Sequence, residues 1–179
     1  MEFSTDYKTH ADPIVNLFTA TFTASEGEEE GQLIGGLARR LLTETPAGDI
    51  YVYTAWEDGS LLGSICFTRL TYTDEPRTIF LLGPVAVATE RQRQGIGQRL
   101  ITHGITSLRE KGVDIVVTYG DPNFYSRVGF TSVTQDEVPS PYSLQHPEGW
   151  LAQSLTGDTI TPLKGPVYCV EAFKDPIFW

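Results

Sequence analysis

Cysteine is scarce in this chain of 179 residues: only Cys66 and Cys169 are present, and they lie far apart in the sequence. Two distant cysteines do not form the framework of a disulfide-stabilised domain, and no spacing of cysteine and histidine suits zinc. The chain therefore has to fold by burying apolar side chains, and its 40% of hydrophobic residues is ordinary for a globular protein. We expect Cys66 to be a small core residue rather than a nucleophile.

Long apolar runs and basic residues are also lacking. The longest apolar stretch, residues 79–88, is interrupted by Gly83-Pro84, whereas a membrane helix needs about twenty apolar residues. No basic segment followed by an apolar run opens the chain, so we expect a cytoplasmic protein without a secretory signal or membrane contact. Thirteen Lys and Arg against 23 Asp and Glu give a formal net charge of −10. This balance argues against a nucleic-acid partner, because phosphate backbones need clustered basic residues.

The spacing of apolar residues predicts one mixed α+β domain over residues 1–179, with a core over about 1–135 and C-terminal strands and an extension over 136–179. Asp58-Gly59 between two β-rich runs predicts a hairpin. We expect helices over residues 12–22, 33–42, about 96–111 and 122–128, with an acidic loop over 25–31. We expect strands over residues 50–56, 61–70, 78–88, 114–119, 130–134, 150–155 and 167–173.

Two features of the β-rich middle of the chain carry more specific expectations. Proline cannot donate to a strand ladder, so the strand that contains Gly83-Pro84 should splay from a neighbour there. The segment that follows is dense in glutamine, arginine and glycine and leads into a helix. The first turn of a helix has unpaired N–H groups at a positive dipole end, and Gly95 and Gly97 allow close approach of a ligand, so the segment suits phosphate. Arg93 and Arg99 add positive charge.

The same segment alone also describes an ordinary tight turn with a solvated basic edge. It lacks the third glycine of the dinucleotide motif and the Gly-Lys-Ser/Thr of a triphosphate loop. In its context, however, Gln92-x-x-Gly95-x-Gly97 is similar to the Gln/Arg-x-x-Gly-x-Gly/Ala signature of the GNAT superfamily of N-acetyltransferases. Residues 81–87 resemble the splayed strand of that family, and Tyr125-x-x-x-Gly129-Phe130 resembles its Tyr-x-x-x-Gly-Phe segment.

The resemblance implies the GNAT-like acyl-CoA N-acyltransferase fold: a mixed central sheet with a splay after the fourth strand and helices on both faces. It implies acetyl-CoA as co-substrate and no metal. It also implies that backbone groups of Val85, Ala86 and Val87 bind the pantetheine arm, with the Val85 N–H facing the thioester carbonyl as an oxyanion donor. The residues whose main-chain amides would hold the pyrophosphate are Arg93, Gln94, Gly95, Ile96, Gly97 and Gln98.

Tyr125 is the candidate general acid, because a departing CoA thiolate needs a proton and a phenol can supply it. The alternative is an aromatic side chain that packs a short helix against the sheet. The general base is not marked by a motif. Glu26, Glu28, Glu29 and Glu30 lie where the acceptor often binds in this superfamily, but they also fit a solvated acidic run. We expect His103 to be a packed side chain rather than a base.

The resemblance therefore implies an enzyme that moves an acetyl group from acetyl-CoA to a primary amine by direct attack in a ternary complex. The acceptor would be a small-molecule or peptide amine, and the acidic composition favours a cationic one. The alternative is a non-catalytic acyl-CoA-binding sensor or regulatory module, which would keep the glycine turn and dispense with Tyr125. The sequence leaves the acceptor, the acyl-chain length and a homodimer open.

Two stretches depart from the common family pattern. No asparagine ends the strand before Tyr125; Tyr119-Gly120-Asp121 stands there, and we expect Asp121 to cap the following short helix with Pro122 at its first position. The proline-rich part from Pro139 onward is longer than the minimal fold requires. Its aromatic residues either cover the acceptor pocket or pack against the edge of the sheet; these are Tyr142, Trp150 and Trp179.

Overall fold

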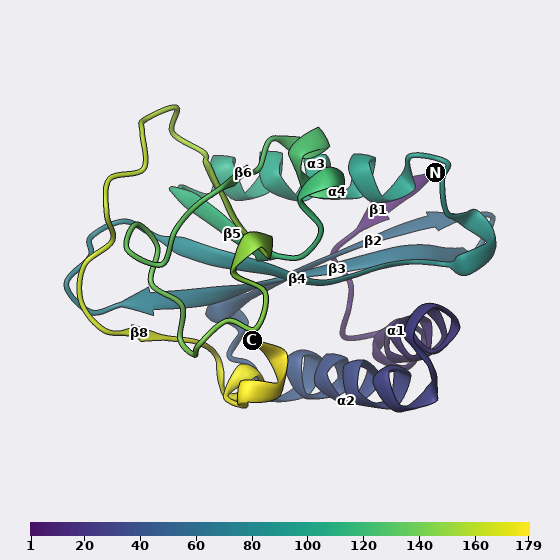
Figure 1. Cartoon of the computed structure of the whole chain (residues 1–179). Helices are drawn as coiled ribbons and strands as arrows, with labels where there is room; N and C mark the ends of the chain where they lie inside the picture. Colours follow the sequence, from purple (N-terminus) through teal and green to yellow (C-terminus); the bar gives the residue numbers. More distant parts are fainter. The chain divides into compact units, whose positions relative to one another are not determined.

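The computed structural model describes residues 1–179 (Figure 1). The helices are α1 (Ala11–Glu26), α2 (Glu28–Glu44), α3 (Ile96–Glu110) and α4 (Pro122–Tyr125). The strands are β1 (Glu2–Ser4), β2 (Ile50–Glu57), β3 (Ser60–Tyr72), β4 (Ile79–Val87), β5 (Ile115–Tyr119), β6 (Thr131–Ser132), β7 (Trp150–Ser154) and β8 (Val167–Tyr168). None of the helices combines the length and the apolar character that crossing a membrane requires.

The strands form a mixed sheet in the order β1-β2-β3-β4-β5-β7-β6, and β8 pairs with β3. Strands β4 and β5 pair in parallel, whereas β1–β2, β5–β7, β6–β7 and β3–β8 are antiparallel. Parallel neighbours need a crossover connection, and α3 is the crossover between β4 and β5. The mixed α/β architecture confirms the expected fold class.

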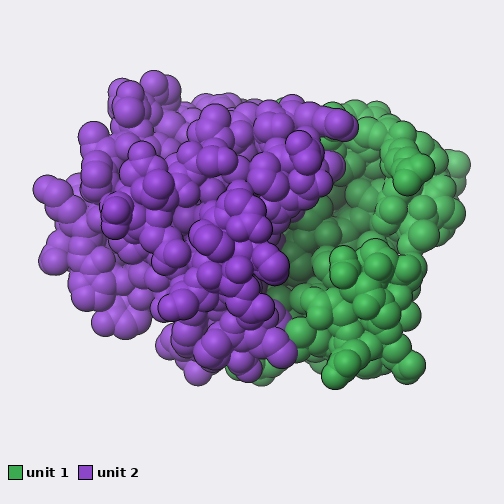
Figure 2. Space-filling view, viewed as in Figure 1, with its two compact units in different colours: residues 1–67, 84–104 green, residues 68–83, 105–179 purple.

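Two compact units divide the chain (Figure 2). The first contains residues 1–67 and 84–104, and the second contains residues 68–83 and 105–179. Strands β3 and β4 and helix α3 each contribute residues to both units. The units are described separately below.

The first unit contains the predicted hairpin between β2 and β3. Asp58 and Gly59 have φ angles of 49° and 75°, the pair of left-handed residues that defines a type I′ turn and matches the twist of two antiparallel strands. Strand β1 was not predicted. It has only three residues and pairs through Phe3 with Ala55 of β2, so it is too short to show the alternation of apolar and polar residues that marks a strand.

Helices α1 and α2 correct the expected acidic loop over residues 25–31. Only Gly27, with a φ of 101°, separates the two helices, and Glu28, Glu29 and Glu30 form the first turn of α2. The run of acidic side chains therefore starts a helix instead of a loop. This placement is favourable because carboxylates stabilise the positive end of the helix dipole.

The two helices approach each other closely through small residues. A Cβ atom at Gly31 would collide with the Thr23 hydroxyl and lie 2.8 Å from the Thr19 carbonyl oxygen, and one at Gly35 would collide with the Thr19 hydroxyl. The helices can pack at this distance only because these two positions carry no side chain.

Helix α3 packs against β3 within the first unit. A Cβ atom at Gly104 would lie 2.7 Å from the Phe67 ring, so the helix backbone rests on that side chain. Cys66, on the other face of β3, is fully buried, and burial raises the pKa of its thiol to about 12. The thiol is thus neutral at physiological pH, as expected for a core residue.

His103 stacks on Phe3, with 4.3 Å between the ring centroids, but stays solvent-exposed. The side chain is therefore only partly packed.

In the second unit, β5 lies between β4 and β7 and is buried over its first four residues. The short helix that follows starts as predicted. The Asp121 carboxylate accepts a hydrogen bond from the Asn123 N–H at 2.9 Å, Pro122 occupies the first turn, and Gly129 ends the segment with a φ of 95°. The extended segment expected over residues 130–134 is a two-residue strand, β6.

The C-terminal aromatic residues form part of the core of the second unit. Trp150 and Trp179 are both buried and lie 6.1 Å apart between ring centroids. Their indole N–H groups donate to the main-chain carbonyls of Val138 and Phe173 at 2.8 and 2.9 Å. The strand predicted over residues 167–173 is confirmed only at Val167–Tyr168; residues 171–173 form a 3₁₀ turn. Packing within the unit therefore accounts for the two tryptophans.

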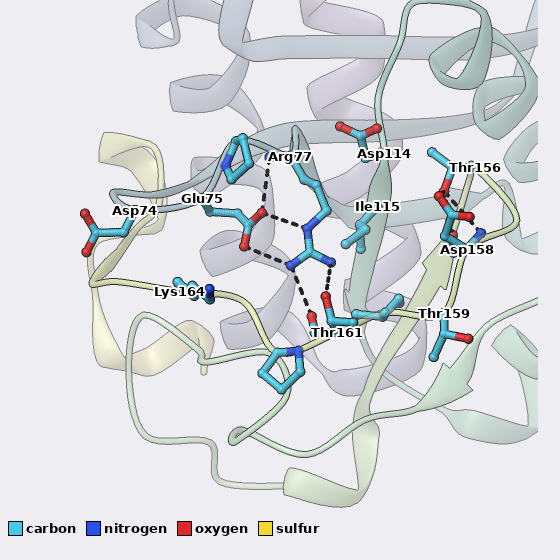
Figure 3. A pocket seen from close by; sticks show the side chains of 14 residues that line it. Asp74, Glu75, Arg77, Asp114, Ile115, Thr156, Asp158, Thr159, Thr161 and Lys164 are labelled. Atoms are coloured by element: carbon cyan, nitrogen blue, oxygen red, sulfur yellow. Dashed lines mark hydrogen bonds and ion pairs between the residues drawn. The ribbon is translucent and has the colours of Figure 1, made fainter.

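A cavity of about 700 Å³ in the second unit adjoins the start of β5 (Figure 3). The Arg77 guanidinium lies beside it, with Glu75 on one side and Thr161 on the other. Arg77 donates to both Glu75 carboxylate oxygens at 2.7 and 2.8 Å and to the Thr161 hydroxyl and carbonyl at 3.1 Å. These bonds fix residues 159–162 to the turn before β4. The cavity is lined by none of the predicted site residues.

The close approach of α1 and α2 predicts opposite effects for two neighbouring glycines. Gly31→Ala should lower the free energy of unfolding by about 1–3 kcal/mol, because the added methyl group meets Thr19 and Thr23. Gly36→Ala is the matched control: its Cβ would meet nothing within 4 Å, so it should raise stability by about 0.5–1 kcal/mol. Denaturant titrations of both variants measure the difference, and effects of the same sign would contradict the packing described here.

The Arg77–Glu75 pair predicts an acid-sensitive contribution to stability. The Glu75 side chain is only 3% exposed, and the hydrogen bond from Arg77 lowers the pKa of its carboxyl from 4.5 to about 2, despite the opposing effect of burial. The unfolded chain binds this proton at a higher pH than the folded chain, so the contribution is full above pH 4.5 and is lost as the pH falls towards 2. Arg77→Gln should therefore cost about 1–3 kcal/mol at pH 7 and much less near pH 2.5.

Arg40→Gln is the control, since its ion pair with Glu44 is about half exposed and should matter little at any pH. Urea unfolding at pH 7 and pH 2.5 measures the contribution. If Arg77→Gln lowered the free energy of unfolding by the same amount at both pH values, Arg77 would not be the cause of the lowered pKa of Glu75.

Candidate functional site

The ladder between β4 and β5 ends at the position where the sequence predicts a splay. The register runs from Ile79↔Ile115 to Leu82↔Thr118, directly before Gly83-Pro84. The Thr118 hydroxyl, which is fully buried, donates to the Leu82 carbonyl at 3.0 Å. The residues of β4 after Leu82 therefore have no partner in that ladder.

The main-chain groups of Val85 point away from β3. The Ala88 N–H donates to the Leu62 carbonyl of β3 at 2.8 Å, and successive residues of a strand direct their main-chain groups to opposite sides. The groups of Val85 and Val87 are therefore directed to the other side of β4. The Val87 carbonyl already accepts hydrogen bonds there, from the Gln92 side chain at 3.1 Å and from Thr21 at 3.4 Å. Gln92, the first residue of the signature, thus fixes the end of β4.

Six residues at the start of α3, 93–98, form what we call the amide bend: residues 93–95 precede the helix, and residues 96–98 are its first three. Arg93 and Gly95 have φ angles of 63° and 76°, and Gln94 between them is not left-handed. An arginine rarely adopts this conformation, which costs about 1 kcal/mol. Left-handed residues near a helix start can turn successive N–H groups towards one point, and concavities of this kind bind anions in other proteins.

None of the N–H groups in the amide bend has a hydrogen-bond acceptor within the protein. The first bond of helix α3 runs from the Arg99 N–H to the Gly95 carbonyl at 3.1 Å, so all N–H groups from Arg93 to Gln98 precede the helical ladder. Gln98 is only half-buried, and Arg93, Gln94 and Gly95 are exposed. Unpaired donors at the positive end of a helix are the physical requirement for binding phosphate oxygens.

The charges around the amide bend divide into two groups. Arg93 and Arg99 are exposed and form no ion pair within the protein. Arg91, by contrast, is joined to Glu57 at the end of β2 by a contact of 2.6 Å. The local charge at the bend is positive although the whole chain carries −10. The neutralisation of Arg91 by Glu57 was not predicted, because the two residues are 34 positions apart.

Tyr125 belongs to the second unit and is half-buried in an aromatic setting. Its ring meets Phe124 and Phe130 edge-on at 5.0 and 5.7 Å. Burial raises the pKa of its phenol to about 12, against a smaller opposite effect of the Thr118 side chain. A Cβ atom at Gly120 would lie 2.7 Å from the Tyr125 ring. The absence of a side chain at Gly120 therefore leaves room for this ring.

Each unit also has contacts that the motifs do not mark. In the first unit, Thr21 and Gln92 anchor Val87, and Arg91 and Glu57 join the bend to β2. In the second unit, Gly120 makes room for Tyr125. These contacts connect residues 5 to 66 positions apart, so no local pattern reveals them. The acidic candidates for a base are helix-terminal, and Glu26, Glu28 and Glu29 are exposed; their position is accounted for by the helix start.

Comparison with known proteins finds related sequences and structures. Residues 46–132 match the model of the acetyltransferase (GNAT) domain, a range that contains β4, the amide bend and Tyr125. The chain is 35% identical over 140 residues to the uncharacterized N-acetyltransferase YjhQ of Escherichia coli, and the match covers 75% of this chain and 77% of YjhQ.

Solved structures show the same fold. A GNAT family acetyltransferase from Brucella melitensis in complex with acetyl-CoA aligns with a TM-score of 0.70 and 26% identity over 97% of both chains. The N-acetyltransferase YhbS from Escherichia coli in complex with CoA aligns with a TM-score of 0.78 and 24% identity, covering 97% of this chain and 92% of YhbS. Together with the extended match to YjhQ and the GNAT domain model, these results show that the chain belongs to the GNAT family of acetyltransferases.

Proposed function

We propose that the protein transfers an acetyl group from acetyl-CoA to a primary amine, and that the amide bend holds the diphosphate of the CoA. The observation that carries the proposal is the set of six consecutive N–H groups, from Arg93 to Gln98, without an acceptor in the protein. A diphosphate offers several oxygens at the spacing of successive amides, and it is attracted by the helix dipole and by Arg93 and Arg99. The complexes of the Brucella and Escherichia relatives with acetyl-CoA and CoA support this ligand.

The end of β4 would bind the pantetheine arm. Residues after Leu82 have no partner in the β4–β5 ladder, and the main-chain groups of Val85 point away from β3, so an extended amide-containing chain can add to them as a strand would. Because the Val87 carbonyl is already engaged by Gln92 and Thr21, the groups proposed to serve the arm are chiefly those of Val85. Its N–H would donate to the thioester carbonyl and stabilise the charge that develops there during attack.

Tyr125 would act as the general acid. The amine nitrogen bonds to the thioester carbon, the carbon–sulfur bond breaks, and the thiolate takes a proton from the phenol; the proton that the new amide nitrogen loses then restores the phenol. A pKa of about 12 keeps this phenol protonated at neutral pH, which is the state that a proton donor needs. The edge-on contacts with Phe124 and Phe130 hold the ring in one orientation.

The second candidate function is a non-catalytic acyl-CoA sensor. It would need the amide bend but not an oriented tyrosine. The space that Gly120 leaves for the Tyr125 ring favours the enzyme, because a sensor has no use for a phenol held in this way.

The acceptor would be a small-molecule or peptide amine, and the excess of acidic side chains, 23 against 13 basic ones, favours a cationic one. CoA release measured against amines, amino acids, peptides and aminoglycosides would identify it.

Removing the phenol hydroxyl should abolish most turnover without affecting CoA binding. Tyr125→Phe should lower kcat by about 10²-fold or more, the usual range for a general acid, while the Kd for CoA stays within twofold of wild type. Tyr168→Phe is the control, since Tyr168 is 54% exposed on β8. Calorimetry and a CoA-release assay provide the two readouts. Unchanged kcat in Tyr125→Phe would remove this residue from the mechanism, and a wild-type protein that binds CoA but acetylates no amine would favour the sensor.

A side chain in the first turn of α3 should block the diphosphate. Gly97→Val should weaken CoA binding at least a hundredfold, because the side chain prevents approach to the main-chain amides. Pantetheine, which lacks the diphosphate, should bind to wild type and variant alike, and this second ligand separates a blocked bend from a misfolded protein. Retained CoA binding by Gly97→Val would show that the diphosphate lies elsewhere.

A further inference from the structure

The first half of the amide bend, residues 93–95, is exposed and has little to hold it in place. The six N–H groups of the bend make no bonds within the protein, and Arg93 has a left-handed backbone that its side chain disfavours. The turn before it is closed by only two main-chain bonds, from Arg91 to Ala88 at 2.8 Å and from Gln92 to Thr89 at 3.5 Å. A segment with so few internal bonds would sample other conformations unless side chains fix it.

Arg91 is the side chain from this segment that reaches a different strand. Its Nη2 atom donates to Glu57 Oε2 at 2.6 Å, and its Nε atom donates to Gln94 Oε1 at 3.2 Å. One end of this bridge is therefore inside the amide bend. The other end is the last residue of β2, directly before the type I′ turn of Asp58 and Gly59, which is a rigid point of attachment.

The electrostatics of the pair fit a bracing role rather than a ligand-binding one. The hydrogen bond from Arg91, together with its charge, lowers the pKa of the Glu57 carboxyl, so this carboxylate is ionised at neutral pH. Arg91 uses its Nε and one Nη on protein acceptors and has a carboxylate beside it. Arg93 and Arg99, which form no ion pair, remain the cationic side chains for the diphosphate.

We propose that Arg91 and Glu57 are positioning residues, which hold the amide bend in its CoA-binding conformation by joining Gln94 to the end of β2. This inference rests on the proposed function of the bend. Its consequence is that Glu57, an acidic residue near an anion-binding site, strengthens the binding of an anion.

The direction in which Glu57→Gln changes the affinity for CoA shows whether Glu57 acts as a brace or only through its charge. If Glu57 acted only through its charge, its removal would make CoA bind more tightly, because a negative charge near the diphosphate would be lost. If it is a brace, Glu57→Gln and Arg91→Gln should each weaken CoA binding about three- to tenfold and raise the KM for acetyl-CoA equally. The kcat at saturating acetyl-CoA should stay within twofold of wild type, and pantetheine binding should not change.

Glu44→Gln is the matched control, because Glu44 also forms an exposed ion pair with an arginine, at 3.0 Å on α2, away from the bend. It should bind CoA like wild type. The charge-exchanged double variant Glu57→Arg with Arg91→Glu should recover binding relative to either single variant, which a loss of folding could not do. Melting temperatures, measured on the same samples, should differ by only a few degrees.

Tighter or unchanged CoA binding by Glu57→Gln would overturn the brace. The same variant binding more tightly while Arg91→Gln binds more weakly would place Arg91 on the ligand itself and would also overturn it. Failure of the wild-type protein to bind CoA would instead contradict the proposed function of the amide bend. Calorimetric titration of CoA and pantetheine into the wild type and the four variants distinguishes these results.

Discussion

A helix cannot satisfy the N–H groups of its own first turn, and the proposed site depends on this constraint. In most helices a capping side chain or water takes up these donors. Here no N–H group between Arg93 and Gln98 has an acceptor within the protein, and three of these donors, those of residues 93–95, precede the helix. Arg93 has a left-handed backbone that a non-glycine residue disfavours, and such strain is common where a segment serves a ligand.

The strand before the bend meets a related constraint. Over residues 79–82, β4 is an ordinary member of a parallel pair, and at Gly83-Pro84 the pairing with β5 stops. A strand with unpaired main-chain groups is unfavourable unless another polar chain pairs with it. The pantetheine arm proposed to lie there would supply such a chain, so one short connection between β4 and α3 would provide both halves of the CoA-binding surface. The anchoring of Val87 by Gln92 and Thr21 marks where the strand stops and the bend begins.

Features set by local chemistry could be predicted from the sequence. Asp58-Gly59 specifies its turn, Asp121-Pro122 caps its helix, and Gly95 marks the turn into α3 with its left-handed backbone, because each acts through its own backbone or that of its neighbours. Features set by distant partners could not be predicted. The ion pair of Arg91 with Glu57 joins residues 34 positions apart, and the acidic run at 28–30 is polar enough to suggest a loop although the helix dipole favours it as a helix start. From the sequence, the C-terminal tryptophans fit the lining of a pocket equally well. In the structure they are buried against each other, and the periodicity of apolar residues along the chain does not reveal such packing.

The central claim is that the N–H groups of residues 93–98 donate directly to the diphosphate of CoA. Amide nitrogen and proton chemical shifts, followed by nuclear magnetic resonance during titration with CoA, test it most directly. The account predicts large downfield proton shifts for these six residues with CoA and small ones with pantetheine, since hydrogen bonding to a charged oxygen deshields the amide proton. Amide signals of 93–98 that stay in place while CoA binding shifts another set of residues would contradict it.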